Sequence, residues 1–193
     1  MVWLFVWFVS RVCAPDFFFL DMKIKLHDIL TEDTLRLLDV MTDESKAQAL
    51  SLARDVYGNY DDLTLMQFLQ LTEGDYTHIG IENPERVEVG QLLWMQGFAD
   101  FCKIFANLCN RMQVPESPES RAAHNGEMPL STREGMLIFA RSYFGFHTFE
   151  EAANTVTVSE YIVARKDTYN TAIYNKNRAD AEKRKAEQGK ARR

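Results

Sequence analysis

Glycine, cysteine and histidine are scarce in this sequence, and those present form no recognised catalytic or ligand-binding pattern. The 9 glycines include no P-loop and no GxGxxG fingerprint, so a phosphate-binding loop is not indicated. Cys13, Cys102 and Cys109 are odd in number and contain no CxxC pair. They indicate neither a disulfide framework nor a zinc site, and they favour a reducing compartment such as the cytoplasm. None of the 4 histidines lies at metal-ligand spacing. We therefore expect no cofactor and no metal, in a protein that is not an enzyme.

Long hydrophobic runs are also missing, even at the strongly apolar start of the chain. The uninterrupted apolar run covers only residues 2–9, and Arg11 and Asp16 follow it. A membrane-spanning helix needs roughly 20 mostly apolar residues, and a signal peptide carries basic residues before its apolar core. The segment fits neither, so we expect no membrane span. Residues 1–21 are a hydrophobic extension, either a misread stretch upstream of a start at Met22 or an arm that docks on the core or a partner. A membrane-associated element is the third alternative.

Charge is unevenly distributed along the chain. Residues 176–193 hold 8 basic and 3 acidic residues, a net charge of +5. Because the whole chain carries −6, the preceding 175 residues carry −11. An acidic body disfavours general nucleic-acid binding through the fold. The tail is expected to bind nucleic acid only weakly, and with a strong dependence on salt.

Apolar residues spaced by three or four positions predict a long helix over residues 87–112. Its apolar stripe consists of Leu92, Met95, Phe98, Cys102, Phe105, Cys109 and Met112. A second group widens that stripe: Leu93, Phe101, Ile104 and Leu108. A stripe this wide should be buried on more than one side, so we expect this helix to lie at the centre of the core.

Capping signals predict the starts of the other helices. Hydroxyl and glutamate residues at capping-box spacing predict helices over 132–143, over 149–154 and from 158 onward. The three pairs are Ser131 with Glu134, Thr148 with Glu151, and Thr157 with Glu160. Upstream, the predicted N-caps are Thr31 and Thr42, and the predicted helix ends are at Gly58 and Gly74.

Strand patterns are short. Only residues 22–29 and 155–158 alternate, and neither stretch has an obvious hairpin partner. We therefore predict an all-α fold, a compact helical bundle around one central hydrophobic helix. Its parts are the extension 1–21, a helical domain 22–174 and a basic solvated tail 175–193. The tail has no large apolar residue, so it should be a charged helix, supported by Asp180 and Arg184 at i,i+4 spacing, or disordered.

Two groups of residues are candidates for partner binding. The stretch YFGFHTF places four aromatic residues around Gly145, which predicts either a corner that plugs the core or an exposed patch that grips a partner. Two tyrosines beside the basic tail predict either stacking on single-stranded nucleic acid or the last tertiary contacts of the final helix. The candidate residues are Tyr143, Phe144, Phe146, Phe149, Tyr169, Tyr174, Lys176, Arg178, Lys183, Arg184 and Lys185.

Three stretches share an organisation: GQLLWMQGFADFCKIF, the segment from EGMLIF to YNKN, and the charged end. They describe a helical body, a turn into a helix beginning TVSEY, and a charged C-terminal helix. In this organisation the chain from Met22 onward resembles bacteriophage accessory assembly proteins, especially tail-assembly chaperones. The resemblance implies a non-catalytic cytoplasmic protein of the bacterial host cell that binds a hydrophobic helical client such as the tape-measure protein. The alternative is a structural virion component, a connector or inner capsid protein, whose basic tail contacts DNA.

Overall fold

The computed structural model describes residue 36 and residues 38–81, 87–113 and 131–191. Residues 1–21, the predicted N-cap Thr31 and the alternating stretch 22–29 lie outside these ranges. The helices are α4 (Asp43–Tyr57), α5 (Leu65–Glu73), the 3-10 helix η1 (Thr77–Ile79), α6 (Val89–Arg111), α8 (Thr132–Phe144), α9 (Phe149–Thr155) and α10 (Val158–Ala191). The described part contains no strand, and its only bridge pairs Thr64 with Thr157. The all-α prediction is confirmed.

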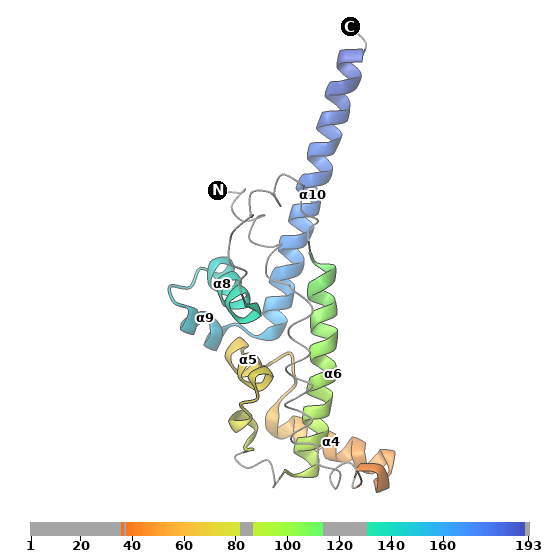
Figure 1. Cartoon of the computed structure of the whole chain (residues 1–193), viewed down its shortest axis with the longest axis vertical. Coiled ribbons are helices and arrows are strands. Elements are labelled where there is room, and N and C mark those ends of the chain that lie inside the picture. Colours follow the sequence, from red (N-terminus) through yellow and green to blue (C-terminus); the bar gives the residue numbers. More distant parts are fainter. Residues whose placement is uncertain (1–35, 37, 82–86, 114–130, 192–193) are drawn as a thin grey trace.

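The helices pack around α6 (Figure 1). α4 crosses the N-terminal part of α6, where the nearest atoms to an added Cβ on Gly90 would be the Ala49 carbonyl oxygen and the Ala53 Cβ, both at 3.5 Å. The first turns of α10 lie against both α6 and α8, because the Tyr161 ring contacts Phe105 at 6.0 Å and Phe139 at 5.3 Å. Helix α6 is therefore the central helix of the body, as predicted.

Aromatic rings fill the centre of the core. The Phe68 ring of α5 lies between Phe98 and Phe105 of α6, with centroid distances of 5.6 and 5.0 Å. Trp94 stacks on Phe98 one turn along the same helix, at 5.7 Å. All seven residues of the predicted stripe are buried. The wider stripe is wrong at Ile104, which is 58% exposed, because it lies on the side of α6 that no described helix covers.

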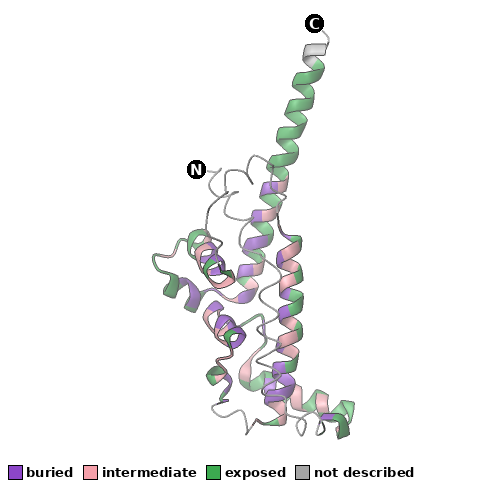
Figure 2. Ribbon diagram, in the orientation of Figure 1, coloured by how far each residue is buried: buried purple, intermediate pink, exposed green. Residues whose placement is uncertain are grey.

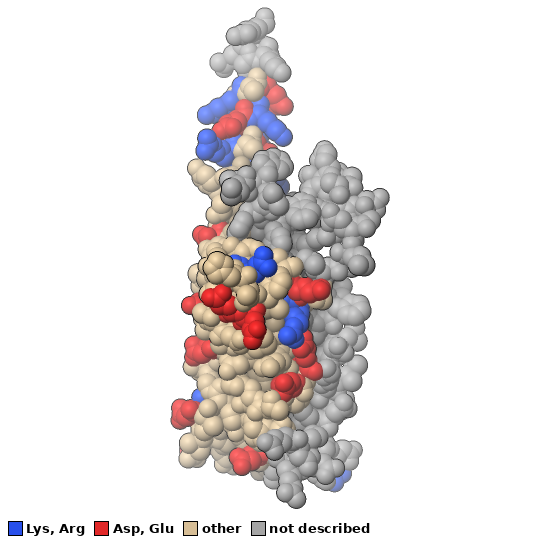
Figure 3. Space-filling view, turned by 90° about the vertical axis from the view of Figure 1, so that its left-hand side faces the viewer, with Lys and Arg blue, Asp and Glu red and all other residues tan. Residues whose placement is uncertain are grey.

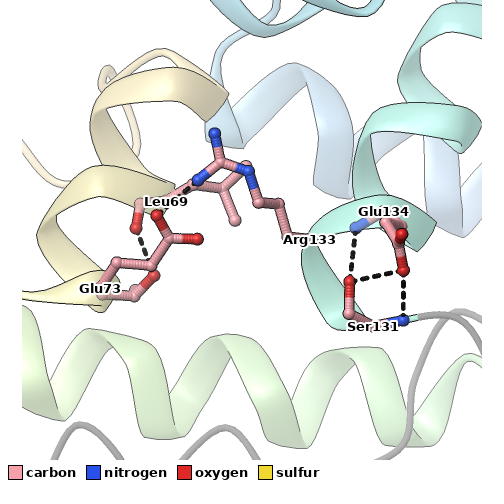
Figure 4. Close-up of polar contacts among 6 residues, drawn as sticks. Leu69, Glu73, Ser131, Arg133 and Glu134 are labelled. Atoms are coloured by element: carbon pink, nitrogen blue, oxygen red, sulfur yellow. Dashed lines mark hydrogen bonds and ion pairs between the residues drawn. The ribbon is translucent and has the colours of Figure 1, made fainter.

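Local capping sets the helix starts, as the sequence predicts. Ser131 accepts from the Glu134 amide at 3.2 Å, and the Glu134 carboxylate accepts from the Ser131 amide at 2.9 Å (Figure 4). These bonds from the Ser131 amide and hydroxyl lower the pKa of Glu134. Thr157 and Glu160 form the same reciprocal pair before α10. The third box differs, because the Glu151 carboxylate accepts from the His147 amide rather than from that of Thr148.

Backbone hydrogen bonds join the loop before α5 to the turn between α9 and α10. The Leu65 amide donates to Val156, and the Val158 amide donates to Leu63, both at 2.9 Å. An exposed ion pair between Arg133 and Glu73 also links α8 to α5 (Figure 4). These contacts hold α5, α8, α9 and the start of α10 in one rigid body.

Helix α10 spans 34 residues, but only its first half belongs to the core. Its last buried residue is Ala172, and every side chain from Tyr174 to Gln188 is exposed (Figure 2). Of the two alternatives for the tail, the structure has the helix, which continues to Ala191. The described i,i+4 ion pair joins Arg178 and Glu182 at 3.0 Å, not Asp180 and Arg184. About 28 Å of solvated helix, at 1.5 Å per residue, thus extends past the body.

Candidate protein-interaction site

The corner between α8 and α9 has a fixed backbone. Gly145 ends α8 in the left-handed conformation, with φ 77° and ψ 25°, and its amide donates to the Arg141 carbonyl. Glycine adopts this conformation without the steric cost of a Cβ. Thr148 then caps α9. The aromatic side chains around Gly145 therefore project from two capped helix ends rather than from a loose loop.

The four aromatic residues of this corner divide into two inward and two outward rings. Tyr143 and Phe146 are half-buried and pack against the core. Phe144 and Phe149 are exposed, by 37% and 43%. The Phe144 ring lies 5.1 Å from Tyr143 and 6.4 Å from Phe146, so the inner pair supports it. The two interpretations of the corner, core plug and exposed patch, each describe half of it.

Arg141 completes the exposed surface. Its guanidinium lies over the Phe149 ring, 4.6 Å from the centroid, which is cation–π geometry. Arg141 is not among the partner-binding residues predicted from the sequence. It lies one helical turn before Gly145, where it can reach across the corner. We call Phe144, Phe149 and Arg141 the aromatic ledge.

Tyr143 ties the ledge to α10. Its hydroxyl donates to the Asp167 carboxylate at 2.9 Å. Burial raises the pKa of Tyr143 above its ordinary value, and the hydrogen bond and charge of Asp167 raise it further. The phenol therefore stays a neutral donor at physiological pH, and Tyr143 is a structural residue rather than an open contact.

The second group of candidates lies along α10. Tyr169 is half-buried and packs against the core, which supports its role as a tertiary contact. Tyr174 is 65% exposed. The basic candidates are all exposed: Lys176, Arg178, Lys183, Arg184 and Lys185. The ledge lies on the side of the body and the basic residues lie beyond its end, so they form two separate surfaces (Figure 1).

The body that carries the aromatic ledge and the projecting half of α10 also differ in charge. In Figure 3, basic side chains gather on the projecting end of α10, while acidic side chains outnumber basic ones over the visible body. Asp61, Glu150 and Glu160 are among the exposed carboxylates of that body. The acidic and basic residues, which are separated along the sequence, are therefore also separated in space.

Helix α4 carries an apolar face that the sequence analysis missed. Leu52 and Val56 are exposed by 60% and 73%, and they lie at i,i+4 spacing on one side of the helix. Ala53 on the other side is buried. The spacing of the apolar residues in the sequence could have predicted this second face, because it places them on two faces of the helix.

The described residues offer no obvious catalytic or metal-binding centre. Cys102 and Cys109 are buried, and burial strongly raises the pKa of the Cys102 thiol, so it is not a thiolate nucleophile. No three His, Cys, Asp or Glu residues within the described ranges are grouped to hold a metal ion. In the same ranges, no helix combines the length and apolar character needed to cross a bilayer.

Comparison with protein families, with curated proteins and with solved structures finds no significant match to this chain. The aromatic ledge and α10 are therefore the features from which a function can be inferred.

Proposed function

We propose that this chain is a non-catalytic assembly protein of the tail-assembly chaperone kind, acting in the cytoplasm of a bacterial host cell. Its client is an apolar helical protein such as a tape-measure protein. The observation that carries the proposal is the aromatic ledge, where Phe144 and Phe149 stay exposed on a corner whose backbone is fixed. A single exposed apolar residue needs no explanation, but two exposed rings on one corner with a capped backbone are typical of interaction surfaces.

The geometry of the ledge suits an apolar helix. Phenylalanine rings bury a large apolar area at little cost in side-chain entropy, because they have few rotatable bonds. The ledge loses even less on binding, since Arg141 and the inner rings already restrict the positions of Phe149 and Phe144. The client side chains that fit are aliphatic, spaced by three or four residues along one helical face.

The proposal is tested by co-expressing the full chain with an apolar helical segment of a tape-measure protein. The double variant Phe144→Ser and Phe149→Ser removes the ledge. The matched control, Leu52→Ser with Val56→Ser, removes two apolar side chains of α4 that are even more exposed, by 60% and 73%. We expect the ledge variant to lose about 30-fold or more in affinity, as two moderate hot-spot residues would, and the control to bind as the unaltered chain does. Equal binding by both variants would refute the assignment.

The alternative, a virion component that contacts DNA, is favoured by the projecting basic helix. Asp180, Glu182 and Glu187 interrupt the positive charge of that helix, and the acidic body repels a polyanion. Binding of duplex DNA that falls steeply with salt and requires Lys183, Arg184 and Lys185 would favour this alternative.

A further inference from the structure

The projecting half of α10 is a helix whose described side chains are exposed. From Tyr174 to Gln188 every side chain is exposed. Isolated helices of this length are only marginally stable in water, even with good helix-forming residues. Alanine, lysine, arginine and glutamate dominate the segment, and the Arg178–Glu182 pair supports it. A surface that packs along this helix would stabilise it further.

The described part of the same chain does not pack along that segment (Figure 1). α10 is continuous from Val158 to Ala191, and its only glycine is Gly189, near the end. It contains no proline, so nothing breaks the helix where it leaves the body. The helix carries its basic residues away from the described acidic residues of its own body (Figures 1 and 3). The charges of the helix and of the described body are therefore complementary but lie apart in one molecule.

The acidic residues that complement the basic helix are exposed on the body. Asp61 and Glu150 are exposed, and no cation in the described residues pairs with them. The Ser159 amide donates to the Asp61 carbonyl, which places Asp61 beside the start of α10, and Glu150 lies in the first turn of the short helix α9 that precedes it. Exposed carboxylates therefore lie on the body both beside the start of α10, at Asp61, and at the start of α9, at Glu150.

We propose that the basic half of α10, residues 174–188, docks on these exposed carboxylates of a second copy of the chain. The docking segment holds five basic and three acidic residues, a net charge of +2, and residues 1–175 carry −11, so the two charges favour the contact. A nucleic acid is a poorer occupant, because the acidic residues on α10 and on the body repel phosphates. Each exposed ion pair contributes little, so the contact needs several pairs and is reversible and sensitive to salt. It joins two different surfaces, so it can repeat from copy to copy or close reciprocally in a pair.

This inference goes beyond client binding and does not depend on it. Its test measures the mass of the full chain by light scattering over a range of protein concentrations. At an ionic strength of about 0.01 M, where the Debye length is about 30 Å, the mass should rise above that of a monomer. At about 1 M, where the length is about 3 Å, it should return to the monomer.

Charge-reversed variants locate the two surfaces. The triple variant Lys183→Glu, Arg184→Glu, Lys185→Glu should remain monomeric at low salt, because it makes the tail acidic. Its matched control, Glu187→Lys on the same helix, should associate more strongly than the unaltered chain. The body variant Asp61→Lys with Glu150→Lys should associate less. Circular dichroism verifies that each variant keeps its helices.

Mixing completes the test. The reversed-tail variant and the reversed-body variant should form a complex with each other, since the unaltered tail of the second meets the unaltered body of the first, and the two reversed surfaces also attract. A monomer at low salt would overturn the proposal. So would association that survives the tail reversal, because another surface would then hold the copies together. Failure of the mixed pair while the unaltered chain associates would exclude the surface around Asp61 and Glu150.

Discussion

Phe68 of α5 contacts both Phe98 and Phe105 of α6, and this packing should be sensitive to substitution. Phe98 is 2% exposed and contacts rings on both sides. Replacing it with alanine leaves a cavity that rigid neighbours cannot fill, so we expect Phe98→Ala to lower the free energy of unfolding by about 3–5 kcal/mol. Urea unfolding followed by circular dichroism measures the change. Ile104→Ala on the exposed side of the same helix is the control and should cost under about 0.5 kcal/mol. A loss below about 1 kcal/mol at Phe98 would mean that α6 packs differently.

Two glycines of α6 should respond in opposite directions to the same substitution. A Cβ on Gly97 would lie 2.1 Å from the Tyr60 hydroxyl oxygen, and that hydroxyl donates to the Trp94 carbonyl at 3.1 Å. The rigid tyrosine ring must shift and lose its bond, so the strain should outweigh the helix propensity of alanine. We expect Gly97→Ala to destabilise the fold by about 1–2 kcal/mol. Gly90→Ala meets only ordinary contacts at 3.5 Å and should be neutral or slightly stabilising. Thermal melting of the two variants side by side tests the pair, and equal melting temperatures would contradict it.

At the scale of the helices, the sequence predicts what is local and misses what depends on distant contacts. Ser131 with Glu134 and Thr157 with Glu160 predict helix starts correctly, because a capping box needs only four consecutive residues. The inward position of Tyr143 follows the helical spacing of the buried Met136, Phe139 and Ala140. Its hydrogen bond to Asp167, which lies 24 residues further along the chain, is not contained in any local pattern. The exposure of Ile104 has the same origin, since it depends on which sides of α6 the other helices cover.

The projecting half of α10 should be dispensable for folding. A chain that ends at Tyr174 loses the charged segment and no buried side chain. Apolar burial is the main favourable term in folding, and this segment contributes almost none. We expect a melting temperature within about 2 °C of the full chain, which corresponds to less than about 1 kcal/mol at this size. Differential scanning calorimetry measures it, and a clearly larger drop would show that the segment packs on the body. Under the self-association proposal, the shortened chain folds but stays monomeric at low salt. Under the client proposal, it keeps the aromatic ledge and binds its client.

At the scale of the whole molecule, the described core lies entirely downstream of residue 22. Its buried residues run from Leu38 to Ala172, and its capped helices begin at Asp43. A chain that starts at Met22 should therefore fold cooperatively, with one unfolding transition by circular dichroism and by tryptophan fluorescence. Trp94 is the probe, because it is buried in the core. If the shortened chain aggregates while the full chain stays in solution, residues 1–21 belong to the core, and the interpretation as a misread stretch is wrong.

The projecting half of α10 also changes how the molecule moves through a liquid. A compact chain of 193 residues has a radius of gyration of about 16 Å. A rod that extends beyond the body adds friction and scattering length but almost no mass. A monomer should therefore elute early from a sizing column and resemble a small oligomer, and its X-ray scattering profile should have a long tail at large interatomic distances.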